Sequence, residues 1–532
     1  MPVITLYYDD LEELSGLDKD TIVQRIPMMG CDIERIEDDH VDIEFFPNRP
    51  DLYSAEGVSR AVRGFFDIET GLRNFSVIPS GIRITKDKEI NRIRPYLACA
   101  VVRGIRFNSR SIESLMSLQE SLHWAVGRNR KKVSIGVHDL RKIRPPFRYI
   151  AQEPDFRFIP LDFAGPMTMR DILEKHPKGI KFAHILERFD KYPLILDSED
   201  NVLSFPPIIN SELTKVIENT EDLFIEVTGL DPAVSFALNI VAASLAERGG
   251  RIESVTINGK TETPDLEPRR MKLKSKEAWA HLGFELPGEE MVHCLEKMRY
   301  GAKASGNMIE VSVPAYRSDI LHTWDLIEDI AIGYGFDRIV PELPSTSTTG
   351  RAHQISKQRD AVREIMVGIG YFEVMPFTLT NDRVQFEMMR RDKAEGTTHI
   401  LYPISEDHTI VRPAILPNLL EILSINRHRE LPQRIFEVGE VVMKCRNEQR
   451  IGCAAIHPQA NFTEIQSVVD AVMRERRMEY EVAESGDPAF IAGRRAEIII
   501  KGRKAGVFGE IHPEVILNFG LEHPVIGFEI EL

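Results

Sequence analysis

The sequence predicts an α+β protein built from several domains, and three observations support this. The chain has 532 residues, whereas single hydrophobic cores stop growing at about 250 to 300 residues. Apolar residues make up 43% and charged residues 28% of the chain, which is the balance of folded globular proteins. Stretches with strand-like alternation are interleaved with stretches of helical periodicity, and there is no internal repeat at a fixed period.

Composition also excludes several classes of protein. The most apolar helix candidate, 233–246, contains Ser235, Asn239 and Ser244 and is shorter than the roughly 18 apolar residues that cross a bilayer. The acidic start lacks the pattern of a signal peptide. Five scattered cysteines without a CxxC pair argue against a disulfide framework and a cysteine zinc site. We therefore expect a cytoplasmic protein with no membrane association.

The net charge of -15 argues against a broad nucleic-acid platform formed by this chain alone, because phosphate binding needs clustered Lys and Arg. Two local basic segments, 128–132 (RNRKK) and 141–148 (RKIRPPFR), remain open to two interpretations. They are either contacts to a phosphate backbone or ordinary solvated surface.

The first half of the chain divides into two predicted domains. Residues 1–85 open with a strand and a helix, and contain a proline-rich turn at 46–57 in which Asp51 or Ser54 can cap the next helix. Residues 90–262 alternate strands and helices. Their clearest elements are strands at 133–137, 194–196, 203–205 and 223–228, a helix capped by Asp231 with Pro232 at its first position, and an Asn-Gly turn within 256–260.

The second half also divides in two. After a linker at 264–270, residues 270–345 form a predominantly helical domain. A Pro-, Ser- and Thr-rich linker at 340–350 then leads to a final domain, 351–532, which alternates amphipathic helices with strands and ends on a strand.

Common enzyme signatures fail. Gly259-Lys260-Thr261 imitates the end of a P-loop but lies in a hairpin turn and lacks the upstream glycine. Two GxG pairs, at 333–335 and 368–370, lack the third glycine of a dinucleotide site. The chain contains no GxSxG elbow and no HExxH pair.

Four carboxylates form a candidate cation site: Asp319, Asp325, Glu328 and Asp329. The last three are spaced i, i+3 and i+4, which places them on one face of a helix, opposite an apolar stripe that includes Trp324. Each like-charge pair costs a helix roughly 0.2 to 0.5 kcal/mol, and Mg²⁺ would offset that cost. The alternative is an acidic, solvated first turn favoured by the helix dipole.

The strand at 223–228 places Phe224, Glu226 and Thr228 on one face. An acid and a hydroxyl on one face suit a small pocket that binds an amino group and a side-chain hydroxyl. His138, and the extended segment 204–211, could complete this pocket. The alternative is an ordinary half-exposed strand in which Asp231 only caps a helix.

Five long segments, in this order, carry a resemblance to a known family: FPNRPDLYSAEG, GVHDLRKIRPPFRYIA, LSFPPIINSELTKVIENTEDLFIEVTGLD, RSDILHTWDLIEDIAIGYGFDRI and RPAILPNLLEILSINRHRELPQRIFEVGEV. The chain resembles the β subunit of phenylalanyl-tRNA synthetase, of the archaeal and eukaryotic type, over essentially its whole length. The resemblance implies two α and two β subunits that use ATP to join phenylalanine to tRNA(Phe), with amino-acid activation in α.

The resemblance also implies roles for the domains. Residues 90–262 resemble the family's B3/B4-like editing domain of mixed α/β type, which hydrolyses tyrosine wrongly attached to tRNA(Phe). Residues 270–345 resemble the helical, winged B5-like domain. Residues 351–532 resemble a class II synthetase-like module, an antiparallel sheet with helices. Because this module lacks the fRxE and GxGxxR arginine motifs, it is expected to pack against α without catalysing.

The family's functional residues carry over onto matching positions. The editing pocket is implied to include His138, Asn210, Ser211, Glu226, Thr228 and Asp231. Glu226 and Thr228 are expected to recognise the substrate, and His138 to position the ester or its attacking water. The magnesium ligands are implied to be Asp319, Asp325, Glu328 and Asp329. Two alternatives remain: a stand-alone deacylase and a non-catalytic scaffold subunit.

Overall fold

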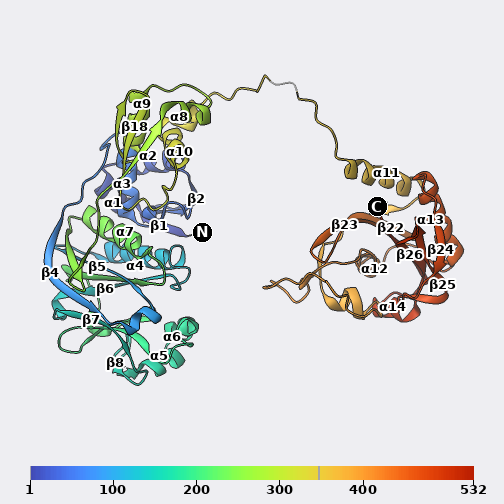
Figure 1. The fold of residues 1–532 in the computed structure, drawn as a ribbon, viewed down its shortest axis with the longest axis horizontal. Helices are drawn as coiled ribbons and strands as arrows, with labels where there is room; N and C mark the ends of the chain where they lie inside the picture. Colours follow the sequence, from blue (N-terminus) through green and yellow to red (C-terminus); the bar gives the residue numbers. More distant parts are fainter. Residues whose placement is uncertain (1, 346–347) are drawn as a thin grey trace. The chain divides into compact units, whose positions relative to one another are not determined.

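A computed structural model describes residues 2–345 and 348–532 (Figure 1). The chain forms two compact units, Met1–Leu343 and Pro344–Leu532. Residues 346 and 347 of the predicted linker lie outside the described residues. Across the described ranges, no helix is both long enough and apolar enough to cross a membrane.

A three-stranded antiparallel sheet in the order β1-β3-β2 opens the first unit. Its elements are β1 (Val3–Tyr7), α1 (Tyr8–Ser15), α2 (Lys19–Arg25), β2 (Cys31–Ile36), β3 (His40–Phe45) and α3 (Ala55–Phe65). Of the two capping candidates for α3, Ser54 is the cap, because its hydroxyl accepts from the Gly57 N–H at 3.2 Å. Asp51 instead pairs with Arg49 in the interior.

A ten-stranded sheet follows, with the order β12-β11-β10-β7-β4-β14-β5-β13-β6 and β15 on β14. Its strands are β4 (Val77–Lys86), β5 (Tyr96–Arg103), β6 (Val133–Asp139), β7 (Phe147–Gln152), β10 (Tyr192–Leu196), β11 (Val202–Phe205), β12 (Ile209–Asn210), β13 (Asp222–Gly229), β14 (Arg251–Ile257) and β15 (Thr261–Thr263). The predicted pairing of 194–196 with 203–205 is confirmed. The Asn-Gly turn joins β14 to β15, with positive φ at Asn258 and Gly259, as a hairpin turn of this kind requires.

The two ends of this sheet curl toward one another. β11 and β13 are far apart in the strand order, yet the Ser204 hydroxyl donates to the Glu226 carboxylate at 2.8 Å. The Asn210 amide on β12 likewise donates to the Val137 carbonyl on β6 at 3.3 Å. The curl therefore closes a space between β11–β12 and β13–β6.

Helices cover one face of the sheet and its flank (Figure 1). They are α4 (Ser109–Trp124), α5 (Met169–Lys175), α6 (Pro177–Phe182) and α7 (Val234–Glu247), with a short pair β8 (Arg157–Phe158) and β9 (Met167–Thr168). The prediction that α7 starts at Pro232 with Asp231 as its cap is wrong, because a short turn separates Asp231 from the first residue of the helix. The helix starts at Val234 after Ala233, and Asp231 accepts from the Ala233 N–H in the preceding turn.

The last part of the first unit has a three-stranded antiparallel sheet, β16-β18-β17, and three helices. They are β16 (Arg269–Lys274), α8 (Ser275–Leu282), α9 (Gly288–Lys297), β17 (Gly301–Ser305), β18 (Met308–Val313) and α10 (Thr323–Tyr334). The predicted linker ends earlier than 270, because β16 starts at Arg269. Trp324 was predicted in the apolar stripe of α10, but its side chain is 58% exposed.

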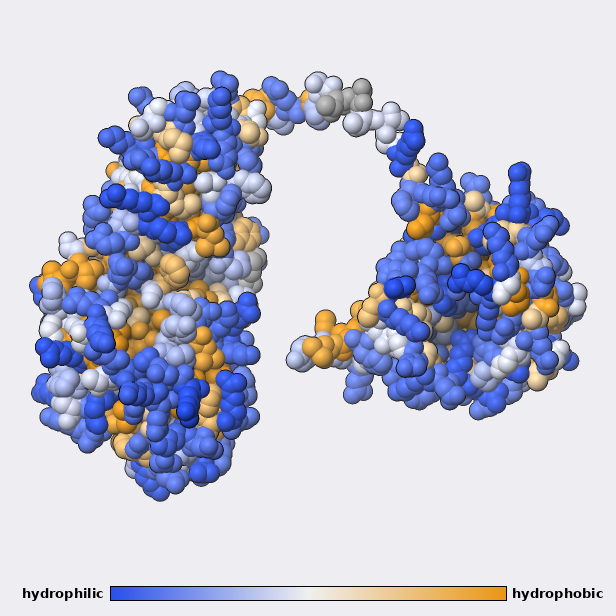
Figure 2. All heavy atoms as spheres, viewed as in Figure 1, coloured by the Kyte–Doolittle hydropathy of each residue, from blue (hydrophilic) through white to orange (hydrophobic). Residues whose placement is uncertain are grey.

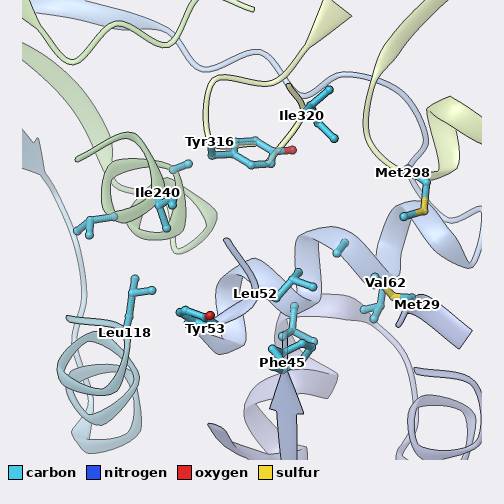
Figure 3. Close-up of a cluster of buried hydrophobic side chains, with 14 of the residues drawn as sticks. Met29, Phe45, Leu52, Tyr53, Val62, Leu118, Ile240, Met298, Tyr316 and Ile320 are labelled. Carbon is cyan, nitrogen blue, oxygen red and sulfur yellow. The ribbon is translucent and has the colours of Figure 1, made fainter. Parts of the chain in front are cut away.

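One hydrophobic cluster runs through all three parts of the first unit (Figure 3). Phe45 and Tyr53 come from the N-terminal part, Leu118 and Ile240 from α4 and α7, and Tyr316 from the segment before α10. All are nearly inaccessible to water. This cluster links the three parts of the first unit, and two further clusters lie within residues 82–257. The finer division at 85 and 262 stays a prediction.

The second unit is a seven-stranded sheet in the order β19-β22-β23-β27-β26-β25-β24, antiparallel except for β19 beside β22. Its elements are α11 (Gln354–Gly368), β19 (Phe372–Glu373), β20 (Leu379–Thr380), β21 (Ile410–Val411), α12 (Leu416–Ile425), β22 (Gln433–Met443), β23 (Arg446–Ile456), α13 (Phe462–Glu475), β24 (Glu481–Glu484), β25 (Phe490–Ile500), β26 (Arg503–Ile511), α14 (Pro513–Asn518) and β27 (Val525–Glu531). The predicted C-terminal strand is confirmed.

Candidate functional site

The curl of the ten-stranded sheet encloses a cavity of about 410 Å³ at its β6 edge. α4, β6, β11, β12 and β13 contribute to its wall, together with the turn that follows β12. The polar side chains that line it are Gln119, Glu120, His123, Arg130, Ser134, Asp162, Lys178, Ser204, Asn210, Thr214, Lys215 and Glu226. A cavity of this size suits one amino-acid side chain and its immediate attachments.

Glu226 is the buried acid of this cavity, and its side chain is only 3% exposed. Its Oε1 accepts from Ser204, while Oε2 is buried without a hydrogen-bond partner among the described residues. Gly136 lies opposite Glu226 in the strand register and leaves room for it. A Cβ at Gly136 would lie 2.8 Å from His138 Nε2 and closer still to Glu226 Oε1. β13 is buried throughout, so the alternative of a half-exposed strand is wrong.

His138 lies beneath the cavity floor and is completely buried. Its Nδ1 is 2.8 Å from the Thr214 hydroxyl, which also donates to the Ser211 carbonyl at 3.2 Å. Nε2 is buried and has no hydrogen-bond partner among the described residues. Nε2 is 3.9 Å from Glu226 Oε1, too far for a direct hydrogen bond.

Thr228 does not reach the cavity wall. Its hydroxyl accepts from Arg94 Nε at 3.0 Å and lies 3.0 Å from the Ser134 hydroxyl, which does line the cavity. Arg94 is 1% exposed, and burial lowers its pKa to about 10, an effect that Tyr149 and Glu226 partly offset. A buried cation thus lies directly behind the pocket.

The other three predicted pocket residues lie at increasing distance from the cavity. Asn210 lines it. Ser211 is just behind, where its hydroxyl donates to the Ile159 carbonyl at 3.4 Å. Asp231 is not among the lining residues, and pairs with Lys132 at 2.9 Å. The structure therefore brings Glu226, Asn210 and the surroundings of His138 together, and leaves Asp231 outside.

A second carboxylate lies at the α4 end of the cavity. Glu120 accepts from Arg130 at 2.5 Å, and His123 Nδ1 is 3.6 Å away. Burial opposes ionisation of Glu120, but His123 and Arg130 outweigh it and lower its pKa to about 2. Burial also lowers the pKa of His123 to about 4. Arg130 further donates to the carbonyl of Ile208 at 2.9 Å, so it ties α4 to the β11–β12 segment.

The four predicted metal carboxylates line a different cavity, of about 280 Å³. Arg317, which is buried, holds Asp319 through two nitrogens and Asp329 at 2.7 Å. The Tyr300 hydroxyl also donates to Asp329. Asp325 accepts at 2.7 Å from the backbone N–H of Leu321 and of His322, and so forms the start of α10.

Glu328 has neither a hydrogen bond nor an ion pair within the described residues. Partial burial, and then the charges of Asp329, Asp325 and Asp319, raise the pKa of its carboxyl. A cation would relieve that repulsion. Throughout the part of the chain that the structure describes, however, no three His, Cys, Asp or Glu side chains are grouped so as to hold a metal ion. The donors fit Mg²⁺ through Glu328 and Asp325 with water completing the shell, but not through all four while Arg317 keeps its contacts.

Several residues in or beside the cavity at the β6 edge were not predicted from the sequence. Ser134 and Gly136 share a face with His138 by strand alternation, so that signal was present in the sequence. Ser204 was included only as part of an extended loop. Arg94 has no local signal, because its burial depends on strands that are distant in the sequence.

Comparison with known proteins identifies the family. The phenylalanine–tRNA ligase β subunit of Methanosarcina barkeri is 60% identical over 537 aligned residues, which cover 100% of this chain and 99% of that protein. The β subunit of Archaeoglobus fulgidus is 52% identical, with 100% and 98% covered. This chain belongs to the phenylalanine–tRNA ligase β-subunit family.

Family models and a solved structure agree with this assignment. A model described as the phenylalanyl tRNA synthetase beta chain CLM domain matches residues 339–532. Models of the tRNA synthetase B5 domain and the B3/4 domain match 271–336 and 87–258. An N-terminal fragment of the phenylalanyl-tRNA synthetase β subunit from Pyrococcus horikoshii is 37% identical, with a TM-score of 0.61, and covers 63% of this chain and 99% of its own. Within this β-subunit family member, the B3/4 match contains every residue that lines the larger cavity.

Proposed function

We propose that this chain is the β subunit of a phenylalanine–tRNA ligase, which uses ATP to attach phenylalanine to tRNA(Phe) together with an α subunit. Identity of 60% over the full length of a relative of that name carries the proposal. The aligned region covers both compact units. The proposed assembly contains two α and two β subunits, as the resemblance implies.

Co-expression with an α subunit tests this function. The pair is expected to charge tRNA with phenylalanine in an ATP-dependent reaction, and each chain alone is expected to be inactive. Phenylalanine-dependent exchange of pyrophosphate into ATP by this chain alone would contradict the proposal. A matched control is an α subunit with this chain truncated at residue 343, which lacks the second unit and is expected not to assemble.

Exposed apolar side chains on the second unit support an α-subunit contact. Figure 2 shows apolar surface on this unit. The large apolar side chains of this unit that are at least 69% exposed are Phe372, Met375, Phe377, Leu401, Tyr402, Ile404, Ile425 and Leu517. Two cavities, of about 570 and 410 Å³, meet at Ile422 beside several of them. Apolar surface of this kind is characteristic of a protein interface.

The second unit is proposed to be a class II synthetase-like core that no longer catalyses. Six antiparallel strands with one parallel strand at the edge support the fold. α12 packs closely on the sheet, since a Cβ at Gly452 would lie 2.8 Å from Ile415 and one at Gly527 would lie 3.0 Å from Leu416. The buried Arg412 donates to both carboxylate oxygens of Glu437 and to the Glu440 carbonyl, so its guanidinium is engaged within the fold.

The cavity lined by Glu226, at the β6 edge, is proposed to be the site where tyrosine wrongly attached to tRNA(Phe) is hydrolysed. A catalytic site rejects a substrate that differs by one hydroxyl only incompletely, which makes a second sieve useful. Glu226 Oε2 supplies an unpaired buried acceptor for the substrate, and Asn210 lies on the opposite wall. His138 Nε2, which is buried without a hydrogen-bond partner among the described residues, is assigned to hold the water that attacks the ester carbonyl. That water adds to the carbonyl, the ester bond to the ribose oxygen breaks, and free tyrosine leaves.

Two rival functions predict different results. A stand-alone deacylase would hydrolyse Tyr-tRNA(Phe) as a purified monomer without α. A non-catalytic scaffold subunit would leave misacylation by the assembled enzyme unchanged when Glu226 is replaced by Ala. The unpaired Oε2 of Glu226 favours the editing enzyme over the scaffold, because an unsatisfied buried acceptor costs about 1 to 3 kcal/mol unless a ligand satisfies it.

Magnesium is proposed to bind at the cavity of about 280 Å³ that the four carboxylates line, with Asp325 and Glu328 as the accessible donors. Binding through Asp319 and Asp329 as well requires Arg317 to give up contacts with them. Bound Mg²⁺ would neutralise the carboxylates of α10 and so stabilise the start of that helix.

Thermal melting of the purified chain tests the magnesium site. Without metal, Glu328→Gln is expected to melt higher than the wild type at pH 7, because the pKa of Glu328 is raised and its ionised form is disfavoured in the fold. That gain is expected to vanish below the unfolded-state pKa, near pH 4. Added MgCl₂ is expected to raise the melting temperature of the wild type and not that of the variant. Glu289→Gln, at an exposed position on α9, is the control; equal magnesium shifts in all three would contradict the site.

A further inference from the structure

Ser134 lines the cavity at the β6 edge and lies on the same face of β6 as Gly136 and His138. In the antiparallel register it is opposite Thr228 and diagonal to Glu226. Diagonal neighbours on one face are roughly 7 to 8 Å apart at the backbone, close enough for one atom of a ligand to contact both side chains. No local pattern in the sequence singles out Ser134.

Arg94 holds this corner from behind. Its guanidinium donates to Thr228 Oγ1 at 3.0 Å, to the Thr228 carbonyl at 2.9 Å and to Ser134 Oγ at 3.1 Å. The remaining contacts are backbone carbonyls of Arg130 and Lys131. No carboxylate pairs with Arg94 among the described residues. Every guanidinium nitrogen of the buried Arg94 therefore donates a hydrogen bond. These bonds hold the hydroxyl groups of Thr228 and Ser134 and the turn before β6 in place.

These contacts determine what Ser134 can offer a ligand. Ser134 and Thr228 share one hydrogen bond of 3.0 Å, in which either oxygen can be the donor. When Thr228 donates, the two lone pairs of Ser134 are filled by Thr228 and by Arg94. A hydroxyl has two acceptor sites and one hydrogen, so the Ser134 hydrogen is then directed into the cavity.

Glu226 offers the opposite character beside it. Ser204 donates to Oε1 at 2.8 Å, and Oε2 is buried and unpaired. The corner thus presents one donor, Ser134, and one acceptor, Glu226. A phenolic hydroxyl has the matching pair, because it donates one hydrogen and accepts at its oxygen.

We propose that Ser134 is a specificity residue that donates to the hydroxyl oxygen of a tyrosyl group whose hydrogen is accepted by Glu226, and that Arg94 and Thr228 are positioning residues for Ser134. The inference rests on the proposed editing function and deepens it. A tyrosyl hydroxyl that donates its hydrogen to Glu226 can only accept a hydrogen bond from Ser134. Its binding therefore favours the arrangement in which Thr228 donates to Ser134 and Ser134 donates to the ligand. A phenylalanyl group would leave both partners unpaired and buried, and such a loss is strongly discriminating.

Deacylation by the assembled αβ enzyme tests this relay, with preformed Tyr-tRNA(Phe) and Phe-tRNA(Phe) as substrates. Ser134→Ala is expected to lower kcat/KM for Tyr-tRNA(Phe) about tenfold, the loss of one hydrogen bond. The slow hydrolysis of Phe-tRNA(Phe) is expected to stay unchanged. Thr228→Val removes the hydroxyl donor while nearly keeping the shape of the side chain. It is expected to lower kcat/KM for Tyr-tRNA(Phe) by the same factor as Ser134→Ala. In the double variant, kcat/KM for Tyr-tRNA(Phe) is expected to fall about tenfold and not a hundredfold, because the two substitutions remove the same hydrogen bond to the ligand.

Conservative variants separate the relay from a structural role. Thr228→Ser keeps the hydroxyl and is expected to retain wild-type discrimination, and Ser235→Ala, at an exposed position on α7, controls for the substitution itself. Unchanged phenylalanine charging shows that each variant assembles. Wild-type activity of Ser134→Ala, equal losses on both substrates, or additive losses in the double variant would overturn the relay while the editing function stands. A wild-type enzyme that does not hydrolyse Tyr-tRNA(Phe) would overturn both.

Discussion

Replacing Gly136 by alanine is expected to lower hydrolysis of Tyr-tRNA(Phe) by the assembled enzyme about a hundredfold or more. The added Cβ would lie 2.8 Å from His138 Nε2 and even nearer to Glu226 Oε1, so one methyl group displaces both proposed functional side chains. A misplacement of about 1 Å in a site is enough for a hundredfold loss. Single-turnover deacylation measures the effect, and misacylated tRNA is expected to accumulate under steady-state charging.

Gly165→Ala is the matched control, because a Cβ at Gly165 would meet no atom within 4 Å. Neither glycine has a positive φ, so backbone strain is the same in both variants. Charging with phenylalanine is expected to be normal in both, since activation is proposed to lie in the α subunit. Normal editing by Gly136→Ala would mean that Glu226 and His138 are not the groups that act on the ester.

Arg317→Met is expected to destabilise the first unit by about 3 to 5 kcal/mol, the usual cost of removing one partner of a buried ion pair. Asp319 and Asp329 would lose their shared cation while remaining buried or nearly so. Denaturant unfolding followed by tryptophan fluorescence measures this change selectively. The three tryptophans of the chain, Trp124, Trp279 and Trp324, all lie in residues 1–343.

Arg270→Met controls for the loss of a positive charge. Arg270 lies on β16, is exposed, and has no ion-pair partner in the described ranges, so its replacement is expected to change the unfolding free energy by less than about 0.5 kcal/mol. Excess Mg²⁺ is expected to restore part of the stability of Arg317→Met, because the freed carboxylates of Asp319 and Asp329 become available to a cation. Equal stability of the two variants would show that the arginine contributes nothing to this cluster.

Local patterns in the sequence were sufficient for individual elements. The alternation of Phe224, Glu226 and Thr228 predicts their shared face, and the Asn-Gly pair predicts the β14–β15 hairpin; both are confirmed. These features depend on the two-residue repeat of a strand and on backbone conformations that few residues adopt. They need no knowledge of distant parts of the chain.

Contacts between distant segments could not be predicted in this way. The Ser204–Glu226 hydrogen bond exists only because the sheet curls, which no single strand encodes. Arg94 reads locally as a surface residue beside Arg92, yet it is buried behind the pocket. Trp324 illustrates the reverse error, since helical periodicity predicted it inside while α10 leaves it exposed. The structure therefore places Glu226 and Asn210 on one cavity, whereas Ser134, Gly136 and Arg94 beside it were not singled out from the sequence.

The hydrophobic cluster that links the three parts of the first unit limits how this polypeptide can be shortened. A fragment cut at 90 and 262 would keep the cavity but leave Leu118 and Ile240 facing water where Phe45, Tyr53 and Tyr316 now cover them. Exposed apolar surface of that extent promotes aggregation. Any trimmed form that retains a folded pocket is therefore expected to need the segments on both sides of it, although neither contributes a side chain to its wall.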